Sequence, residues 1–142
     1  VFVLCPLERT SPEARTLVQS LVRAIGALPT YLPPERHDRL VAAISHLPYA
    51  LAVTLVETAE ALGGDDPLLW SLAAGGFRDT SRVAASSVPM MMDILATNRE
   101  PILEALREAQ GQLSTFTAAL EANDMAFLRQ RLEAAADRRR RI

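Results

Sequence analysis

An uncharged run of seventeen residues, 40–56 (LVAAISHLPYALAVTLV), restricts the possible folds of this chain more than any other feature. A helix that is apolar on every side must be buried against protein or lipid. The run is shorter than the roughly 20 residues that a membrane span needs. We therefore expect a soluble protein with no membrane partner, in which a long helix covers about residues 35–62.

Four polar or ring-constrained side chains interrupt this run, namely Ser45, His46, Pro48 and Tyr49. Pro48 has no N–H, and its ring presses on the carbonyl of Ile44, so we expect the helix to bend and open there. Asp38 joins Ser45 and Tyr49 in one stripe, because the spacings of seven and four residues match the helical period. The stripe fits either a kinked core helix with satisfied polar groups or the wall of a binding site. The residues alone leave both interpretations open.

The first 34 residues predict a strand, a helix and a second strand. Residues 1–5 (VFVLC) are apolar throughout, which is typical of a strand buried on both faces of a parallel sheet. Thr10 and Glu13 form a capping-box pattern, which predicts that Thr10 is the N-cap of the following helix. The run 27–32 completes a β-α-β unit. Such a unit leaves strand edges and one sheet face uncovered, so we expect further strands from sequence upstream of Val1 or from another copy.

The remainder of the chain has helical patterns. We expect helices at 67–74, 88–95, 99–122 and 124–137, with Thr97 or Asn98 as the N-cap of the third. Apolar residues of that third helix follow a heptad-like seam at Ile102, Leu106, Ala109, Leu113, Phe116 and Leu120. The fold class is therefore mainly α, a helical bundle after a short β-α-β segment. The expected domains are 1–34 and 35–142.

Composition excludes several classes of function. The net charge is −2, so no general attraction to nucleic acid is expected. The only cysteine, Cys5, permits no internal disulfide and fits a reducing, cytoplasmic compartment. His37 and His46 lie nine residues apart, on opposite sides of a helix, so we expect no metal site.

The segment 75–82 (GGFRDTSR) is a second candidate site, which we expect to be a loop. Gly75 and Gly76 permit a positive φ or a close approach of the backbone. Arg78 and Arg82 flank an acidic and hydroxylic stretch, and a free arginine there would bind a carboxylate or phosphate with its planar fork. The equally weighted alternative is an ordinary helix N-cap with a surface ion pair.

Together these motifs resemble a known family. Segments 37–52 and 74–98 are similar to the carboxy-terminal region of prephenate/arogenate dehydrogenases, enzymes of tyrosine biosynthesis. The shared order is an HD pair, SHLP, GGFRDTxR and a DI…N run. Residues 1–14 look like the last β-α-β part of that family's nucleotide-binding domain, so the resemblance covers nearly the whole chain.

The resemblance implies a Rossmann domain followed by an all-helical domain that forms a homodimer. It implies oxidative decarboxylation of a cyclohexadienyl acid, prephenate or arogenate, with hydride transfer to NAD or NADP. Arg82 would bind a substrate carboxylate. Ser45, His46 and Tyr49 would line the same pocket, and a backbone N–H of Gly75 or Gly76 would come close.

Two departures from the family pattern matter. Family members that use prephenate often read SHLPH, whereas Tyr49 occupies the last position here, which puts the preference for prephenate in doubt. No GxGxxG occurs, and the family's catalytic histidine belongs to the nucleotide domain, so we expect no catalytic residue in this chain and no turnover by it alone.

Two alternatives remain at this point. The chain could be a non-catalytic all-helical dimerisation or regulatory module. It could also be an unrelated helical mutase of the shikimate branch that uses Arg78 and Arg82 as carboxylate clamps, although the strand–helix–strand start argues against this.

Overall fold

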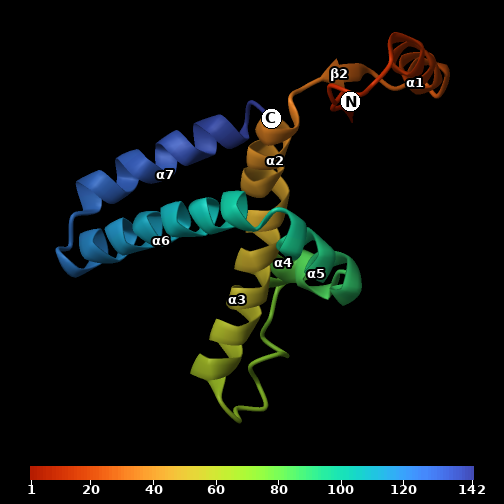
Figure 1. Cartoon of the computed structure of the whole chain (residues 1–142). Coiled ribbons are helices and arrows are strands. Elements are labelled where there is room, and N and C mark those ends of the chain that lie inside the picture. The colour runs from red at the N-terminus through yellow and green to blue at the C-terminus, as the bar shows by residue number, and fades with distance from the viewer. The chain divides into compact units, whose positions relative to one another are not determined.

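Helices make up most of the chain, and the computed structural model describes residues 1–142 (Figure 1). The elements are β1 (Phe2–Leu4), α1 (Pro12–Ala24), β2 (Pro29–Tyr31), α2 (Pro34–Val41), the π-helical turn η1 (Ala42–His46), α3 (Leu47–Gly63), α4 (Gly75–Ser81), the 3₁₀ turn η2 (Arg82–Ala85), α5 (Val88–Thr97), α6 (Arg99–Glu121) and α7 (Met125–Arg139). They form two compact units, Val1–Ile102 and Leu103–Ile142. The predicted fold class, mainly α after a β-α-β segment, is confirmed.

The β-α-β unit forms as predicted, with β1 and β2 parallel and Val3 opposite Thr30. Each strand has three residues, fewer than expected. The expectation that the first strand is buried on both faces is wrong, because Phe2 is 47% exposed. The sheet contains two strands only, so one edge of each strand has no neighbour. The division of the chain at residue 34 into two domains stays a prediction.

The N-cap of α1 is Ser11, and the prediction of Thr10 is wrong. The Ser11 hydroxyl accepts a hydrogen bond from the Ala14 N–H at 3.2 Å. The residue before a proline is pushed into extended conformations, and Pro12 therefore keeps Ser11 outside the helix at φ −67° and ψ 154°. The Thr10 hydroxyl instead accepts from the Leu7 N–H at 2.9 Å.

The apolar run lies in one continuous helical stretch, Pro34–Gly63, which is gold to olive in Figure 1. Its centre is the π-helical turn η1, where the Leu47 N–H bonds back to the carbonyl of Ala42, five residues earlier. This wider turn comes directly before Pro48, which has no N–H to offer the carbonyl of Ile44. The predicted opening of the helix near Pro48 is therefore present as one π-helical turn.

By length and composition alone, this 30-residue stretch could cross a membrane. The uncharged run 40–56 is shorter than a membrane span needs, but the helix extends beyond it at both ends. Its outer turns carry charged residues, among them Glu35, Arg36 and Glu57. Core helices of soluble proteins share this length and composition.

Residues 67–74 form turns and irregular backbone, so the helix predicted there is wrong. The Asp66 carboxylate accepts from the Leu68 N–H at 2.9 Å, which offers the backbone a turn in place of a helix. The loop expected at 75–82 is also wrong, because it forms α4 and the start of η2. The hydroxyls of Thr80 and Ser81 bond to carbonyls four residues earlier, so they do not interrupt the helix.

The two C-terminal helices agree with the predicted ranges to within two residues at each end. Within the second unit, α6 and α7 run antiparallel (Figure 1). Arg131 of α7 donates to the Gln112 carbonyl at 3.0 Å, and its guanidinium lies 5.8 Å from the centre of the Phe116 ring. Asn98 directly precedes α6, as predicted for its N-cap, and its main-chain carbonyl accepts from the Ile102 N–H at 3.2 Å, but neither Asn98 nor Thr97 caps the helix with its side chain. Thr97 bonds to the Asp93 carbonyl, and the Asn98 side chain has other partners, described below.

Candidate functional site

The two sequence motifs lie on elements that pack together. Both α4 and η2 pack against α3, within the first unit. Ser45 and His46 end the π-helical turn, and Tyr49 follows in the first turn of α3. Gly75 and Gly76 begin α4, and Arg82 begins η2. The fold therefore brings the SHLPY and GGFRDTSR segments, which are some thirty residues apart in sequence, to neighbouring elements.

His46 is buried and is held by one partner that the sequence did not predict. Its Nδ1 lies 3.1 Å from Nδ2 of Asn98, and the same Asn98 nitrogen lies 2.9 Å from the main-chain oxygen of Asp38. His46 and Asn98 are 8% and 7% exposed. Asn98 belongs to the DI…N run of the family pattern, so a signal was present, but sequence periodicity suggested only a helix cap.

The stripe of Asp38, Ser45 and Tyr49 forms no hydrogen bonds among its own side chains. The Asp38 carboxylate instead lies 3.0 Å from Nδ1 of His37, its neighbour in sequence. The π-helical turn changes the angular spacing between Asp38 and Tyr49, which an ideal helix would keep on one line. No three His, Cys, Asp or Glu side chains lie close enough together to hold a metal ion.

Arg78 and Arg82 are both exposed, and neither forms an ion pair within the chain. The neighbouring Asp79 also has no cationic partner, and the residue that caps α4, Ala74, has no polar side chain. The alternative of a capped helix with a surface ion pair therefore does not describe this segment. The Arg82 guanidinium therefore has no ion-pair partner within the chain.

Gly75 and Gly76 are not in the left-handed region, so that part of the expectation is wrong. A Cβ atom added at either position would meet no heavy atom within 4 Å. The chain itself therefore does not require glycine here. The free space above both residues leaves room for the close approach of a ligand or a partner.

Comparison with known proteins decides the family. Residues 33–134 match the family described as "Prephenate dehydrogenase, dimerization domain". The chain belongs to the prephenate dehydrogenase family. The resemblance predicted from the SHLP and GGFRDTxR motifs is confirmed.

Relatives of known activity span more than this chain. It is 32% identical over 138 residues to the prephenate dehydrogenase of Bacillus subtilis, which covers 97% of the chain and 37% of that protein. A prephenate dehydrogenase from A. aeolicus, solved with hydroxyphenyl propionate and NAD+, superposes with a TM-score of 0.90 at 28% identity, over 96% of this chain and 48% of that one. Synechocystis arogenate dehydrogenase gives 0.82 at 28% identity, over 99% and 51%. The chain thus spans between about a third and a half of these relatives.

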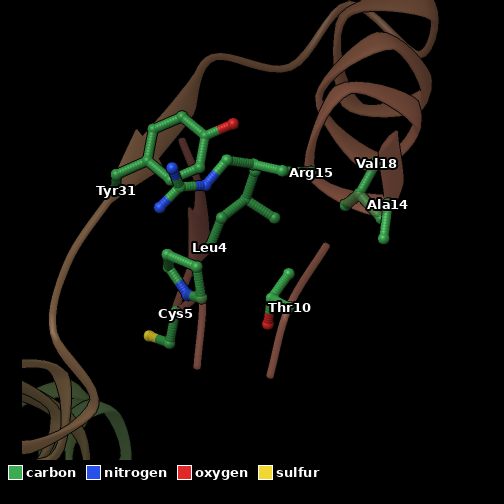
Figure 2. Close-up of a pocket in the computed structure, with 8 residues that line it drawn as sticks. Leu4, Cys5, Thr10, Ala14, Arg15, Val18 and Tyr31 are labelled. Atoms are coloured by element: carbon green, nitrogen blue, oxygen red, sulfur yellow. The ribbon is translucent and has the colours of Figure 1, made fainter. Parts of the chain in front are cut away.

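A cavity of about 170 Å³ lies in the β-α-β unit of this prephenate dehydrogenase family member and contains none of the predicted site residues (Figure 2). Its lining comes from the end of β1 and the first turns of α1, together with Tyr31, whose ring lies 5.6 Å from the Arg15 guanidinium. The lining is mainly apolar apart from Thr10, Arg15 and Tyr31. An apolar lining of this kind is typical of a sheet face that other secondary-structure elements cover in the complete fold. It has few polar groups that could recognise a polar ligand.

The pKa of His46 lies below its ordinary value of 6.5, because burial disfavours the charged ring. The negative charge of Asp38 opposes this shift, and His37 adds to it. Between the lowered pKa and 6.5 the unfolded state binds more protons than the folded state. The His46 contribution to stability is therefore full above pH 6.5 and is lost as the pH falls below it.

We expect the free energy of unfolding of the chain to decrease between pH 7 and pH 5, with a His46 share of at most about 1.4 kcal/mol per pH unit. Urea unfolding at several pH values measures this slope. His46→Gln should show a shallower slope, whereas His37→Gln removes only the smallest of the three causes and should keep most of the His46 share. Equal slopes in wild type and His46→Gln would contradict the lowered pKa.

Proposed function

We propose that this chain is the carboxy-terminal portion of a prephenate or arogenate dehydrogenase, and that it supplies the dimer interface and the binding site for a substrate carboxylate. The intact enzyme would carry out oxidative decarboxylation of a cyclohexadienyl acid in tyrosine biosynthesis. The observation that carries this proposal is the packing of the SHLPY helix against the segment with a free Arg82, in a chain that matches a B. subtilis prephenate dehydrogenase over 97% of its length.

In this proposal Arg82 binds the carboxylate through its two-pronged guanidinium. Ser45, His46 and Tyr49 form the wall of the pocket, and the open backbone at Gly75 and Gly76 permits close approach of the substrate ring. The two-electron oxidation places a hydride on NAD or NADP, and loss of CO₂ is favoured because the ring becomes aromatic. No glycine-rich phosphate turn occurs in this chain, so we assign no cofactor contact to it.

The β-α-β unit supports the same proposal from physical grounds. Its two-stranded parallel sheet has an unpaired edge on each strand, and its cavity has a mainly apolar lining. A parallel sheet is stable when both faces and its edges are covered. We infer that a nucleotide-binding domain completes this sheet in the intact protein, which we expect to be cytoplasmic.

One experiment tests the proposal directly. The chain joined to its upstream coding sequence should reduce NAD or NADP in the presence of prephenate or arogenate, followed by absorbance. The 142-residue chain alone should not reduce the nucleotide, because it covers only 37% of the B. subtilis protein. That coverage also favours the alternative that the chain by itself is a dimerisation or regulatory module. An intact protein that binds neither acid would overturn the proposal, and isomerisation of such an acid without nucleotide would point to a mutase.

Tyr49 is the position where we expect substrate preference to change. In the intact enzyme Tyr49→His should lower KM for prephenate relative to arogenate about tenfold, because a hydrogen bond to a charged group contributes about 1.5–3 kcal/mol. Steady-state kinetics with both acids measures the ratio. Tyr31→His, a substitution of the other tyrosine, is the matched control and should leave the ratio unchanged. An unchanged ratio in Tyr49→His would remove Tyr49 from the specificity site.

A further inference from the structure

The side chain of Asn98 connects three parts of the first unit. It lies between α5 and α6, it is 7% exposed, and its Nδ2 reaches both the main-chain oxygen of Asp38 in α2 and Nδ1 of His46 in the π-helical turn. Neither contact follows from helix capping. A buried amide with two such partners determines which hydrogen-bonding role each partner takes.

The hydrogen-bond roles follow from chemistry. A main-chain carbonyl oxygen can only accept, so the atom of Asn98 that faces Asp38 must be the amide nitrogen. The second N–H of that same nitrogen is then available to Nδ1 of His46 at 3.1 Å. Nδ1 accepts only when it carries no proton. In the neutral imidazole, the proton must then sit on Nε2.

The other charged groups near His46 leave this arrangement unchanged. The Asp38 carboxylate lies 3.0 Å from His37, so it is engaged by a different ring. Burial lowers the pKa of His46, Asp38 partly offsets this, and His37 adds to it, so the ring is neutral at pH 7. A proton on Nδ1 would also face the N–H of Asn98, with no acceptor available.

Nε2 of His46 has no hydrogen-bond partner within the chain. No side-chain nitrogen or oxygen is fully buried without a partner, so Nε2 must reach the surface of the chain. The buried ring therefore presents one accessible edge, and that edge carries an N–H.

We propose that Asn98 is a positioning residue that fixes His46 in the tautomer with its proton on Nε2, so that His46 offers a ligand a neutral N–H donor. Such a donor fits an oxygen-bearing ligand, a hydroxyl or a carboxylate, and the ligand part of this inference rests on the proposed function. If Nε2 carried no proton, it would accept a hydrogen bond and would require a ligand with an N–H or O–H donor. Asn98 thus determines a chemical property of the site without contact with the ligand.

The test is ¹⁵N NMR of the histidine-labelled 142-residue chain at pH 7.5, with His37→Gln used to assign the two rings. In the wild type we expect Nδ1 of His46 to have the shift of an unprotonated ring nitrogen and Nε2 that of a protonated one. Asn98→Asp replaces the donor with a carboxylate, which should move the proton to Nδ1 and raise the pKa of His46. Asn123→Asp, the same change at the other asparagine of the chain, should alter neither.

A wild-type spectrum with the proton on Nδ1, or with both tautomers averaged, would overturn the proposal, and it requires no variant to fold. An unchanged His46 tautomer in folded Asn98→Asp would overturn it as well. Both readouts are independent of the proposed enzyme activity. If the tautomer is as stated while the intact protein binds neither prephenate nor arogenate, the proposed function fails and the positioning role of Asn98 stands.

Discussion

Replacement of Arg82 by alanine in the intact enzyme is expected to raise KM for the cyclohexadienyl acid about 10- to 100-fold, with a smaller change in kcat. A charge-assisted hydrogen bond contributes about 1.5–3 kcal/mol, and each 1.4 kcal/mol is a factor of ten in affinity. The fold should survive, because Arg82 is exposed and forms no ion pair or hydrogen bond within the chain. Steady-state kinetics, with circular dichroism as the folding check, measures both quantities.

Arg78→Ala is the matched control for this prediction, since Arg78 lies on the same segment and is also exposed and free of ion pairs. Arg78→Ala should leave KM for the acid within about twofold of the wild-type value. Arg82→Lys should recover part of the affinity, because it keeps the charge and loses the planar fork. A fall in kcat at unchanged KM for Arg82→Ala would show that the residue acts only in the transition state, contrary to carboxylate binding in the ground state.

Much of the fold was predictable because the signals were local. The position of α3 follows from the apolar run, from Pro48 near its start and from Gly63-Gly64 at its end. The periodic spacing of apolar residues predicted the ends of α6 and α7 to within two residues. The errors arose where neighbouring residues compete for the same role. Both Thr10 and Ser11 are good caps, and Pro12 decides in favour of Ser11 through the backbone conformation that it imposes.

The segments around Asp66 and Gly75 show a second kind of error. Periodicity favoured a helix over 67–74 and a loop over 75–82, and the structure has the reverse. The Asp66 carboxylate forms a turn with the Leu68 N–H, whereas the hydroxyls of α4 bond to their own helix. A propensity scale gives Asp, Thr and Ser similarly low helix preferences. Here the Asp66 hydrogen bond favours a turn, whereas those of Thr80 and Ser81 are compatible with a helix.

The segments of the candidate site could be selected from the sequence, whereas the contacts between distant residues could not. Residue types alone selected the SHLPY and GGFRDTSR segments, and the structure packs α4 and η2 against α3; a site shared by the two segments stays a prediction. The contact of His46 with Asn98 joins residues 52 positions apart. No periodicity within one helix contains that information, because it depends on how the end of α5 packs against α2 and the π-helical turn.

The largest structural effect is expected from Leu51→Asp in α3. Leu51 and Leu62 are 39% and 84% exposed, and their spacing of 11 residues within α3 puts them on one side of that helix; Leu40 and Ile44, before and within the π-helical turn, are exposed as well. We propose that this stripe is covered by a second copy of the chain, because residues 33–134 match a dimerization domain. Burial of a carboxylate there should weaken association at least about 100-fold, as expected when a charge replaces a central apolar contact.

Sedimentation velocity of the 142-residue chain at micromolar concentration checks this prediction, with a dimer expected for the wild type and a helical monomer for Leu51→Asp. Glu57→Arg changes the charge at an exposed position about 120° around the same helix, and it should remain dimeric. A wild-type monomer would remove the dimer proposal altogether. If Leu51→Asp forms a dimer of unchanged affinity, the dimer interface does not include this face of α3. The exposed apolar residues of α3 would then contact a different partner, and the length of the helix permits a membrane as that partner.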